Sequence, residues 1–176
     1  MSIVFDEPTL ADAEEIARVH VQCWQEAYAE LLPDEFLKNL SADARVAQWR
    51  NAISDPDVFV RVAREAGRIV GFVSCGPARD GEAKGADGEI FAIYILKAYH
   101  GQKIGRSLIA AAARFWLSKG GRNLIVLSMA GNNQASAFYE ALGGVQVYEG
   151  SFEIAGVPMA DKGHLFNKLA ELAASA

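Results

Sequence analysis

The stretch "EIFAIYILKAYHGQKIGRSLIAAAARFWLSKG", residues 89–120, decides the fold of this chain. Its first part, residues 89–96, is almost entirely apolar, which is typical of a strand covered on both faces of a sheet. Residues 104–119 are rich in alanine and predict a helix that ends at Gly120. A second apolar run, "NLIVLSMA" at 123–130, follows that helix. Since a helix separates the two strands, we expect a parallel crossover unit.

The loop between the first strand and the helix carries two glycines, Gly101 and Gly105, and two cations, Lys103 and Arg106. A helix N-terminus exposes unpaired backbone N–H groups, and a loop leading into it can form a nest for phosphate. Glycine there allows positive φ and close approach of a ligand. On spacing alone, a plain turn with a solvated basic edge explains these residues equally well. The loop is one residue too short for a P-loop and lacks G-x-G-x-x-G.

The rest of the chain is expected to extend the sheet on both sides of this unit. We predict helical segments at residues 9–32, 34–40 and 42–53 and a weakly helical tail from residue 168. Antiparallel strands are predicted at residues 2–8, 58–65, 68–77, 145–154 and 157–167. The polar loop at 78–88 is the best candidate for disorder. We therefore predict a single α/β domain over residues 1–176. Its mixed, mostly antiparallel sheet has about six to seven strands, with helices on both faces.

Composition excludes several classes of protein. The formal net charge of -5 argues against a general nucleic-acid binder. Cys23 and Cys75 lack CxxC or Cys/His spacing, so we predict buried free thiols, no metal site and a reducing, cytoplasmic location. No segment has the composition of a signal peptide or the apolar length of a membrane span, so we expect no membrane partner. An exposed sheet edge makes a homodimer plausible.

The loop resembles the acyl-CoA signature [QR]-x-x-G-x-[GA] of the GNAT superfamily of N-acetyltransferases, with His100, Lys103 and Gly105 at the three fixed positions. If the middle position needs positive φ, lysine there is strained by about a kcal/mol or more. Downstream, "NNQASAFYEALGG" at 132–144 is similar to the family's N-x-x-A-x-x-F-Y-x-x-x-G-F segment. The opening "HVQCWQEAYAELLP" at 20–33 looks like the first helix of one GNAT subgroup. The resemblance spans nearly the whole chain.

This resemblance implies a GNAT-like fold with a splayed parallel pair of strands, acetyl-CoA as the acyl donor, and no metal. The loop N–H groups would hold the pyrophosphate, and the pantetheine arm would pair with the strand edge at Ile93 and Ile95. The Ile95 N–H would meet the developing oxyanion. Asn132 would bind the arm or cap its own helix. The implied cofactor-binding residues are Ile93, Tyr94, Ile95, His100, Gly101, Gln102, Lys103, Ile104, Gly105, Arg106, Ser107, Asn132 and Tyr139.

Acetyl transfer to an amine needs a base for the amine and, where one is in reach, a proton donor for the thiolate. Glu89 heads the central strand and is the candidate base; otherwise it is a solvated carboxylate that ends a loop. Glu153 and Asp161 are weaker candidates, and His20 is expected to be a packed helix residue. Tyr139 is the candidate acid, since the resemblance places its hydroxyl at the sulfur. Adjacent helix residues point about 100° apart, so we expect only one of Phe138 and Tyr139 to face the pocket.

The N-terminal helices would cover the acceptor side, where Trp24, Tyr28 and Trp49 can line a pocket, although core packing is the commoner role of such residues. An acidic protein favours a cationic acceptor, but net charge is a weak guide. The sequence thus predicts an N-acetyltransferase that acts on a primary amine of a small molecule or peptide by direct attack in a ternary complex. A non-catalytic module that senses acyl-CoA is the alternative, and a nucleotide binder is disfavoured by the short loop.

Overall fold

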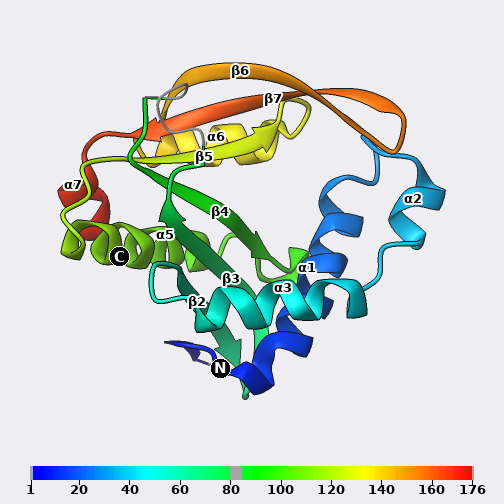
Figure 1. Ribbon diagram of the computed structural model, residues 1–176, viewed down its shortest axis with the longest axis horizontal. Coiled ribbons are helices and arrows are strands. Elements are labelled where there is room, and N and C mark those ends of the chain that lie inside the picture. Colours follow the sequence, from blue (N-terminus) through cyan, green and yellow to red (C-terminus); the bar gives the residue numbers. More distant parts are fainter. Residues whose placement is uncertain (1, 80–84, 176) are drawn as a thin grey trace.

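The computed structural model describes residues 2–79 and 85–175. In this part of the chain seven strands form one sheet in the order β1-β2-β3-β4-β5-β7-β6 (Figure 1). The strands are β1 (Ile3–Asp6), β2 (Phe59–Glu65), β3 (Arg68–Pro77), β4 (Gly88–Ile95), β5 (Leu124–Met129), β6 (Val145–Ile154) and β7 (Val157–Phe166). The helices are α1 (Ala13–Ala27), α2 (Asp34–Lys38), α3 (Asp43–Ser54), α5 (Ile104–Ser118), α6 (Asn133–Ala141) and α7 (Leu169–Ala173), with short 3-10 turns η1 (Leu10–Asp12) and η2 (Lys97–Tyr99).

The pairing of the strands confirms the predicted mixed sheet. Only β4 and β5 run parallel, because α5 carries the chain back between them. All other neighbouring strands are antiparallel. The last hairpin turns at Ala155 and Gly156, which both have positive φ (53° and 74°), a combination that suits the twist of a two-residue hairpin.

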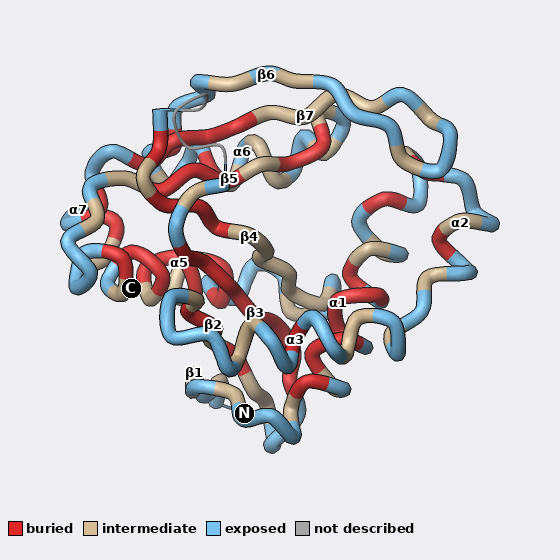
Figure 2. Tube along the Cα trace, viewed as in Figure 1, coloured by how far each residue is buried: buried red, intermediate tan, exposed pale blue. Residues whose placement is uncertain are grey.

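Helices cover both faces of the sheet, as predicted (Figures 1 and 2). On one face α5 and α7 bury the largest hydrophobic cluster against β3, β4 and β5. On the other face α1 and α3 pack over β2 and β3 around Ile16, Trp49 and Phe72. The sheet is therefore a central layer, and its strands are apolar on both sides in the middle of the molecule.

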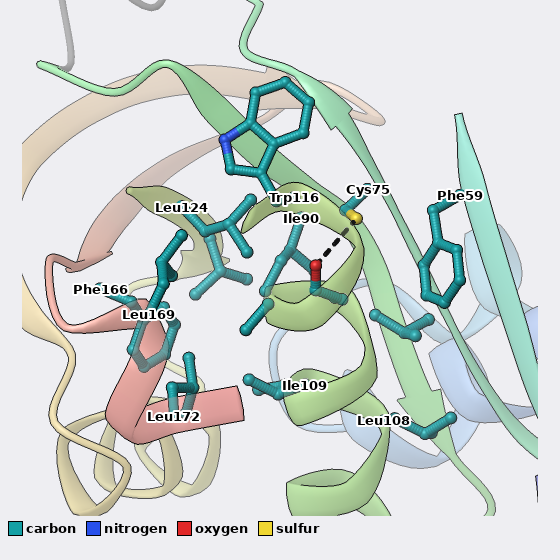
Figure 3. Close-up of a cluster of buried hydrophobic side chains, with 14 of the residues drawn as sticks. Phe59, Cys75, Ile90, Leu108, Ile109, Trp116, Leu124, Phe166, Leu169 and Leu172 are labelled. Carbon is teal, nitrogen blue, oxygen red and sulfur yellow. Dashed lines mark hydrogen bonds between the residues drawn. The ribbon is translucent and has the colours of Figure 1, made fainter. Parts of the chain in front are cut away.

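The helix α5 approaches the sheet closely because its inner face is built from small residues. Ala112 and Ala113 are fully buried, and the carbonyl of Ala112 lies 3.9 Å from Cys75 Sγ on β3 (Figure 3). The tail helix α7 buries Leu169 and Leu172 against this cluster. The C-terminal segment, predicted from sequence as only weakly helical, is thus held by tertiary packing rather than by intrinsic propensity.

One expectation about the elements needs correction, and another falls on residues outside the described ranges. The first helix was expected to continue to Leu32, but α1 ends at Ala27 and the chain turns, with Leu31 and Leu32 donating to the Tyr28 carbonyl. Pro33 disfavours helical geometry in Leu32, the residue before it, but the helix already ends at Ala27, so this proline does not set its end. Residues 80–84 of the loop that the sequence marks as the best candidate for disorder lie outside the described residues, so that expectation is not tested.

Candidate active site

A cavity opens where the parallel strands separate. β4 and β5 are paired only from Gly88 to Ile90 and from Leu124 to Val126, although both strands continue. Beyond this pairing lies a cavity of about 530 Å³, walled by residues 90–95 of β4 and 126–128 of β5. Residues of α1, the loop after η2 and α6 complete its lining. This arrangement is the splayed parallel pair that the family resemblance implies.

The edge of β4 that faces this cavity offers backbone hydrogen-bonding groups. Leu96 N donates to the Val70 carbonyl on β3 at 2.9 Å. Since successive residues of a strand point their N–H and C=O groups to opposite sides, Ile93 and Ile95 direct theirs away from β3 and towards the gap. The carbonyl of Ile95 is bonded by Nε2 of His100 at 2.9 Å. The N–H groups of Ile93 and Ile95 are left facing the cavity.

The loop between η2 and α5 holds a run of unused donors. Within the described residues, the backbone N–H groups of residues 101–106 donate no hydrogen bond, whereas those of Tyr99, His100 and Ser107 bond within the loop. Gly101 and Lys103 both have positive φ, 78° and 64°. Successive N–H groups around a left-handed residue form a concave anion site. The loop thus has the donors and the fixed charge that a diphosphate needs.

Gly105 has a different role from the one expected for it. Its backbone is helical, so it does not need positive φ. A Cβ at this position would lie 2.8 Å from Cζ of Phe138 and 3.1 Å from Cδ1 of Ile95. Glycine is required here because α6 packs directly against the first turn of α5, which brings the loop and α6 together at one end of the cavity.

Three tyrosine side chains meet at the cavity. The hydroxyls of Tyr28 and Tyr94 lie 3.4 Å apart, and both residues line the cavity together with Tyr139. Burial, and to a lesser extent the charge of Tyr28, raises the pKa of Tyr139 far above its usual value, so its hydroxyl keeps its proton at neutral pH. Phe138 lines the cavity as well, so the expectation that only one of this aromatic pair would face the pocket was wrong.

Asn132 both caps α6 and lines the cavity. Its Oδ1 accepts a hydrogen bond from Ala135 N at 3.1 Å, which is the capping role that the sequence left open. The Asn132 side chain also interacts with the Tyr28 hydroxyl, which ties α6 to the acceptor side of the cavity.

Glu89 lies beneath the surface rather than in the cavity lining. It is 1% exposed and its carboxylate accepts hydrogen bonds from Arg79 N (2.9 Å), Nε (3.3 Å) and Nη2 (2.6 Å). The alternative of a solvated carboxylate was therefore wrong. This geometry favours a structural tie between β4 and the loop that precedes it, and the catalytic role of Glu89 stays a prediction. Glu153 and Asp161 do not line the cavity either.

The side chains expected on the acceptor side divide into two groups. Tyr28 lines the cavity, and Trp24 packs behind it with 5.1 Å between ring centroids. Trp49 and His20 belong to the packed aromatic layer below, where His20 stacks on Tyr94 at 5.0 Å. Burial, reinforced by the charge of Arg45, lowers the pKa of His20 to about 3, which makes it too weak a base at neutral pH.

Several cavity residues escaped the sequence analysis. Cys23 and Glu26 reach the cavity from the same face of α1, and Glu26 is the one carboxylate in the lining that the structure describes. Their spacing of three along an amphipathic helix was the available signal. On β5, Val126, Leu127 and Ser128 form a wall, which no local pattern indicates because it depends on where two strands part.

The two cysteines are buried and unpaired, as predicted. Burial raises the pKa of each thiol to about 12, so neither is a reactive thiolate at neutral pH. Among the described residues there is no group of three or more His, Cys, Asp or Glu side chains arranged to hold a metal ion. No helix in the described ranges has the length and apolarity to cross a membrane.

The structure has a mixed sheet with one splayed parallel pair of strands and a cavity where these strands separate. A loop rich in unused backbone N–H donors borders this cavity. These three features define a GNAT-type acyltransferase. Comparison with known proteins agrees: residues 14–144 match the Acetyltransferase (GNAT) family. The chain belongs to this family. It is 38% identical over 157 residues to an uncharacterized N-acetyltransferase, YuaI, of Bacillus subtilis, covering 89% of this chain and 88% of that protein.

Solved structures share the fold at low sequence identity. PaiA N-acetyltransferase from Thermoplasma acidophilum, in complex with coenzyme A, superposes with a TM-score of 0.70 and 19% identity over 92% of this chain and 98% of its own. The acetyltransferase YncA from Salmonella typhimurium, with its cofactor acetyl-CoA, superposes with a TM-score of 0.73 and 16% sequence identity. The match covers 95% of this chain and 94% of that one. At these identities the likeness establishes the architecture alone.

Proposed function

We propose that this protein transfers an acetyl group from acetyl-CoA to a primary amine of a small molecule or peptide, by direct attack in a ternary complex. The proposal rests on one observation: the cavity and the loop with unused N–H groups lie next to each other. The β4–β5 splay forms a cavity, and the unused N–H groups of residues 101–106 lie in the loop at its border. A ligand with a diphosphate at one end and an extended amide chain at the other uses both.

The residues of the chain fit such a donor. The loop N–H groups and the charges of Lys103 and Arg106 would hold the diphosphate. The edge of β4 at Ile93 and Ile95 would pair with the amides of the pantetheine arm, as an added strand does. Ile104 and Gly105 line the same cavity and keep the first turn of α5 close to the ligand. Bound acetyl-CoA supplies the activated acyl group.

The protein's contribution to the reaction is positional and electrostatic. We assign the Ile95 N–H as the donor to the thioester carbonyl oxygen, where negative charge develops in the transition state. We assign the Tyr139 hydroxyl, which burial keeps protonated at neutral pH, as the proton donor to the sulfur as the carbon–sulfur bond breaks. The proton that the amine nitrogen loses on forming the amide then restores the hydroxyl, directly or through water. Tyr28 lines the cavity from the end of α1, and Trp24 behind it fixes its ring, so both belong to the acceptor side.

A second candidate is a module that binds acyl-CoA without turnover. It is favoured by one observation: Glu26, the one carboxylate in the described cavity lining, already accepts hydrogen bonds from Lys97 N and Gln22 Nε2, and Glu89, which lies outside the lining, is held by Arg79. The cytoplasm, where thiols such as those of Cys23 and Cys75 stay reduced, is the location we propose. The edge strand β6 is where a homodimer would form, because Val145 and Val147 are 57% and 48% exposed there.

The two candidates separate in one experiment. Acetyl-CoA binding is measured by calorimetry, and thiol release is followed with acetyl-CoA and a panel of primary amines and peptides. Binding together with amine-dependent thiol release supports the transferase. Binding without release across the panel supports the sensing module, and absence of binding contradicts both.

A further inference from the structure

Arg45, near the start of α3, is a half-buried cation without a counter-ion. Within residues 2–79 and 85–175, no carboxylate lies within 4.0 Å of its guanidinium and none of its side-chain N–H groups donates a hydrogen bond. The guanidinium carbon instead lies 5.2 Å from the ring centroid of Trp24. Burial lowers the pKa of Arg45, which shows that its charge is partly desolvated and poorly compensated. A guanidinium has five N–H donors and no acceptor, so this one is left for a ligand.

Polar atoms of the side chains next to Arg45 also lack hydrogen bonds. Trp49 Nε1 and His20 Nδ1 are buried without a hydrogen-bond partner among the described residues, whereas Trp24 Nε1 makes no hydrogen bond of good geometry but interacts with the Tyr94 hydroxyl. An indole N–H can only donate. His20 contacts both tryptophan rings, with its ring centroid 6.2 Å from that of Trp24 and 5.6 Å from that of Trp49, so these groups form one cluster. A buried indole N–H without a partner is costly, and a ligand with acceptor oxygens relieves that cost.

This cluster adjoins the cavity. Tyr94 lines the cavity, stacks on His20, and interacts electrostatically with Arg45. Trp24 lies behind Tyr28, another tyrosine of the cavity wall. The hydroxyls of Tyr28 and Tyr94 lie 3.4 Å apart, so an acceptor binds against these two side chains rather than between them. Its remaining polar group then extends past Tyr28 and Trp24 towards Arg45.

The charges along this wall favour an anionic group rather than a second cation. Glu26, the carboxylate described in the cavity lining, already accepts hydrogen bonds from Lys97 N at 2.8 Å and Gln22 Nε2 at 2.9 Å. Arg45 has no such partners in the part of the chain that the structure describes. A polyamine would meet an uncompensated positive charge here, whereas a carboxylate would meet up to two parallel donors.

We propose that the acceptor is a small amine that carries a carboxylate, such as an amino acid, and that Arg45 binds this carboxylate. The inference rests on the proposed acetyl transfer and names its substrate class. It replaces the expectation, based on net charge alone, of a purely cationic acceptor. Arg45 acts in acceptor specificity and has no part in the chemical step.

The test compares α-, β- and γ-amino acids with their matched carboxamides, which keep the amine and lose the negative charge. Thiol release with acetyl-CoA gives kcat/KM for each pair, and calorimetry without acetyl-CoA gives direct binding. The variants are Arg45→Gln, Arg45→Lys and, as the matched control, Arg50→Gln. Arg50 lies on the same helix, is more than half exposed and pairs with Glu14 at 3.7 Å. Circular dichroism of each variant confirms folding.

We expect the best acid to exceed its carboxamide about 10- to 100-fold in kcat/KM, the effect of a hydrogen bond to a charged group. Arg45→Gln removes this preference, mainly through KM, Arg45→Lys keeps part of it, and Arg50→Gln keeps all of it. Equal use of acids and carboxamides, or a preference that survives in Arg45→Gln, overturns the inference. If no acceptor leads to thiol release, the proposed acetyl transfer fails. Calorimetry then tests the inference separately: binding of the amino acids that is lost in Arg45→Gln supports it, and binding that does not depend on Arg45 overturns it.

Discussion

Gly105 on α5 and Phe138 on α6 are in such close contact that a methyl group on Gly105 would lie 2.8 Å from Cζ of the phenylalanine ring. The substitution Gly105→Ala must therefore displace α6 or tilt the ring, and a displaced α6 carries Tyr139 with it. We expect a loss of about 1 to 3 kcal/mol in the free energy of unfolding, measured by urea denaturation. Coenzyme A binding should weaken as well, because α5 and α6 both line the cavity.

Gly101→Ala is the control for that substitution. Gly101 has φ of 78°, and a Cβ at this position would meet no heavy atom within 4 Å, so only backbone strain of about 1 to 2 kcal/mol is expected. Replacing Phe138 by leucine in the Gly105→Ala background should recover part of the stability. Equal stability of Gly105→Ala and the wild type would contradict the close packing.

Lys103 adopts φ of 64° immediately before α5, a conformation that costs a non-glycine residue about 1 to 2 kcal/mol. Lys103→Gly removes this strain and should raise the free energy of unfolding by about that amount. It also removes a positive charge from the loop, so coenzyme A should bind more weakly and with a shallower dependence on salt. Lys103→Ala keeps the strain and loses the charge. If Lys103→Gly binds coenzyme A as tightly as the wild type at low salt, the charge has no role.

Tyr139→Phe tests the proposed proton donor directly. The substitution leaves the buried ring in place and removes only the hydroxyl, whose pKa is raised by burial. We expect kcat to fall on the order of 100-fold while acetyl-CoA binding, measured by calorimetry, stays within about threefold of the wild type. Tyr28→Phe is the comparison, since this hydroxyl lies 3.4 Å from that of Tyr94 and is assigned to the acceptor side. Unchanged kcat in Tyr139→Phe removes the assignment.

The fold could be predicted from the sequence because local patterns of apolar and turn residues indicate its strands. β3 runs from Arg68 to Pro77 and β6 from Val145 to Ile154, the bounds that alternation and turn residues predict. The helix after the loop starts at Ile104, also as expected. The patterns missed the end of α1 at Ala27, and the tail predicted as weakly helical is held as α7 by packing against neighbours distant in sequence.

The candidate active site could be predicted from the sequence only in part. The resemblance raised the condition that the position of Lys103 needs positive φ, and the structure has φ of 64° there. The environment of Glu89 did not follow, because its partner Arg79 lies ten residues upstream across a polar loop. The separation of β4 from β5 after Ile90 and the isolation of Arg45 are likewise properties of the assembled sheet and helices, which no local spacing encodes.

His20 predicts how stability depends on pH. Burial lowers its folded-state pKa to about 3, against about 6.5 in the unfolded chain. Between these values the unfolded chain binds more protons, so the free energy of unfolding decreases as pH falls, by up to about 1.4 kcal/mol per pH unit from this residue. Above a pH of about 6.5 it contributes no slope. His20→Phe should flatten the curve between about pH 6.5 and 3 in denaturation measurements; identical slopes would show that His20 titrates normally in the folded protein.

Glu89→Gln separates a structural role from a catalytic one. The buried carboxylate binds the guanidinium and backbone N–H of Arg79, and the amide replaces these contacts poorly. Because the Arg79 side chain is 66% exposed, we expect a modest loss of about 1 to 2 kcal/mol in the free energy of unfolding. Arg79→Gln breaks the same ion pair from its other side and should match it. In both variants kcat should stay within about threefold of the wild type. A fall in kcat on the order of 100-fold in Glu89→Gln, but not in Arg79→Gln, would instead identify Glu89 as the base.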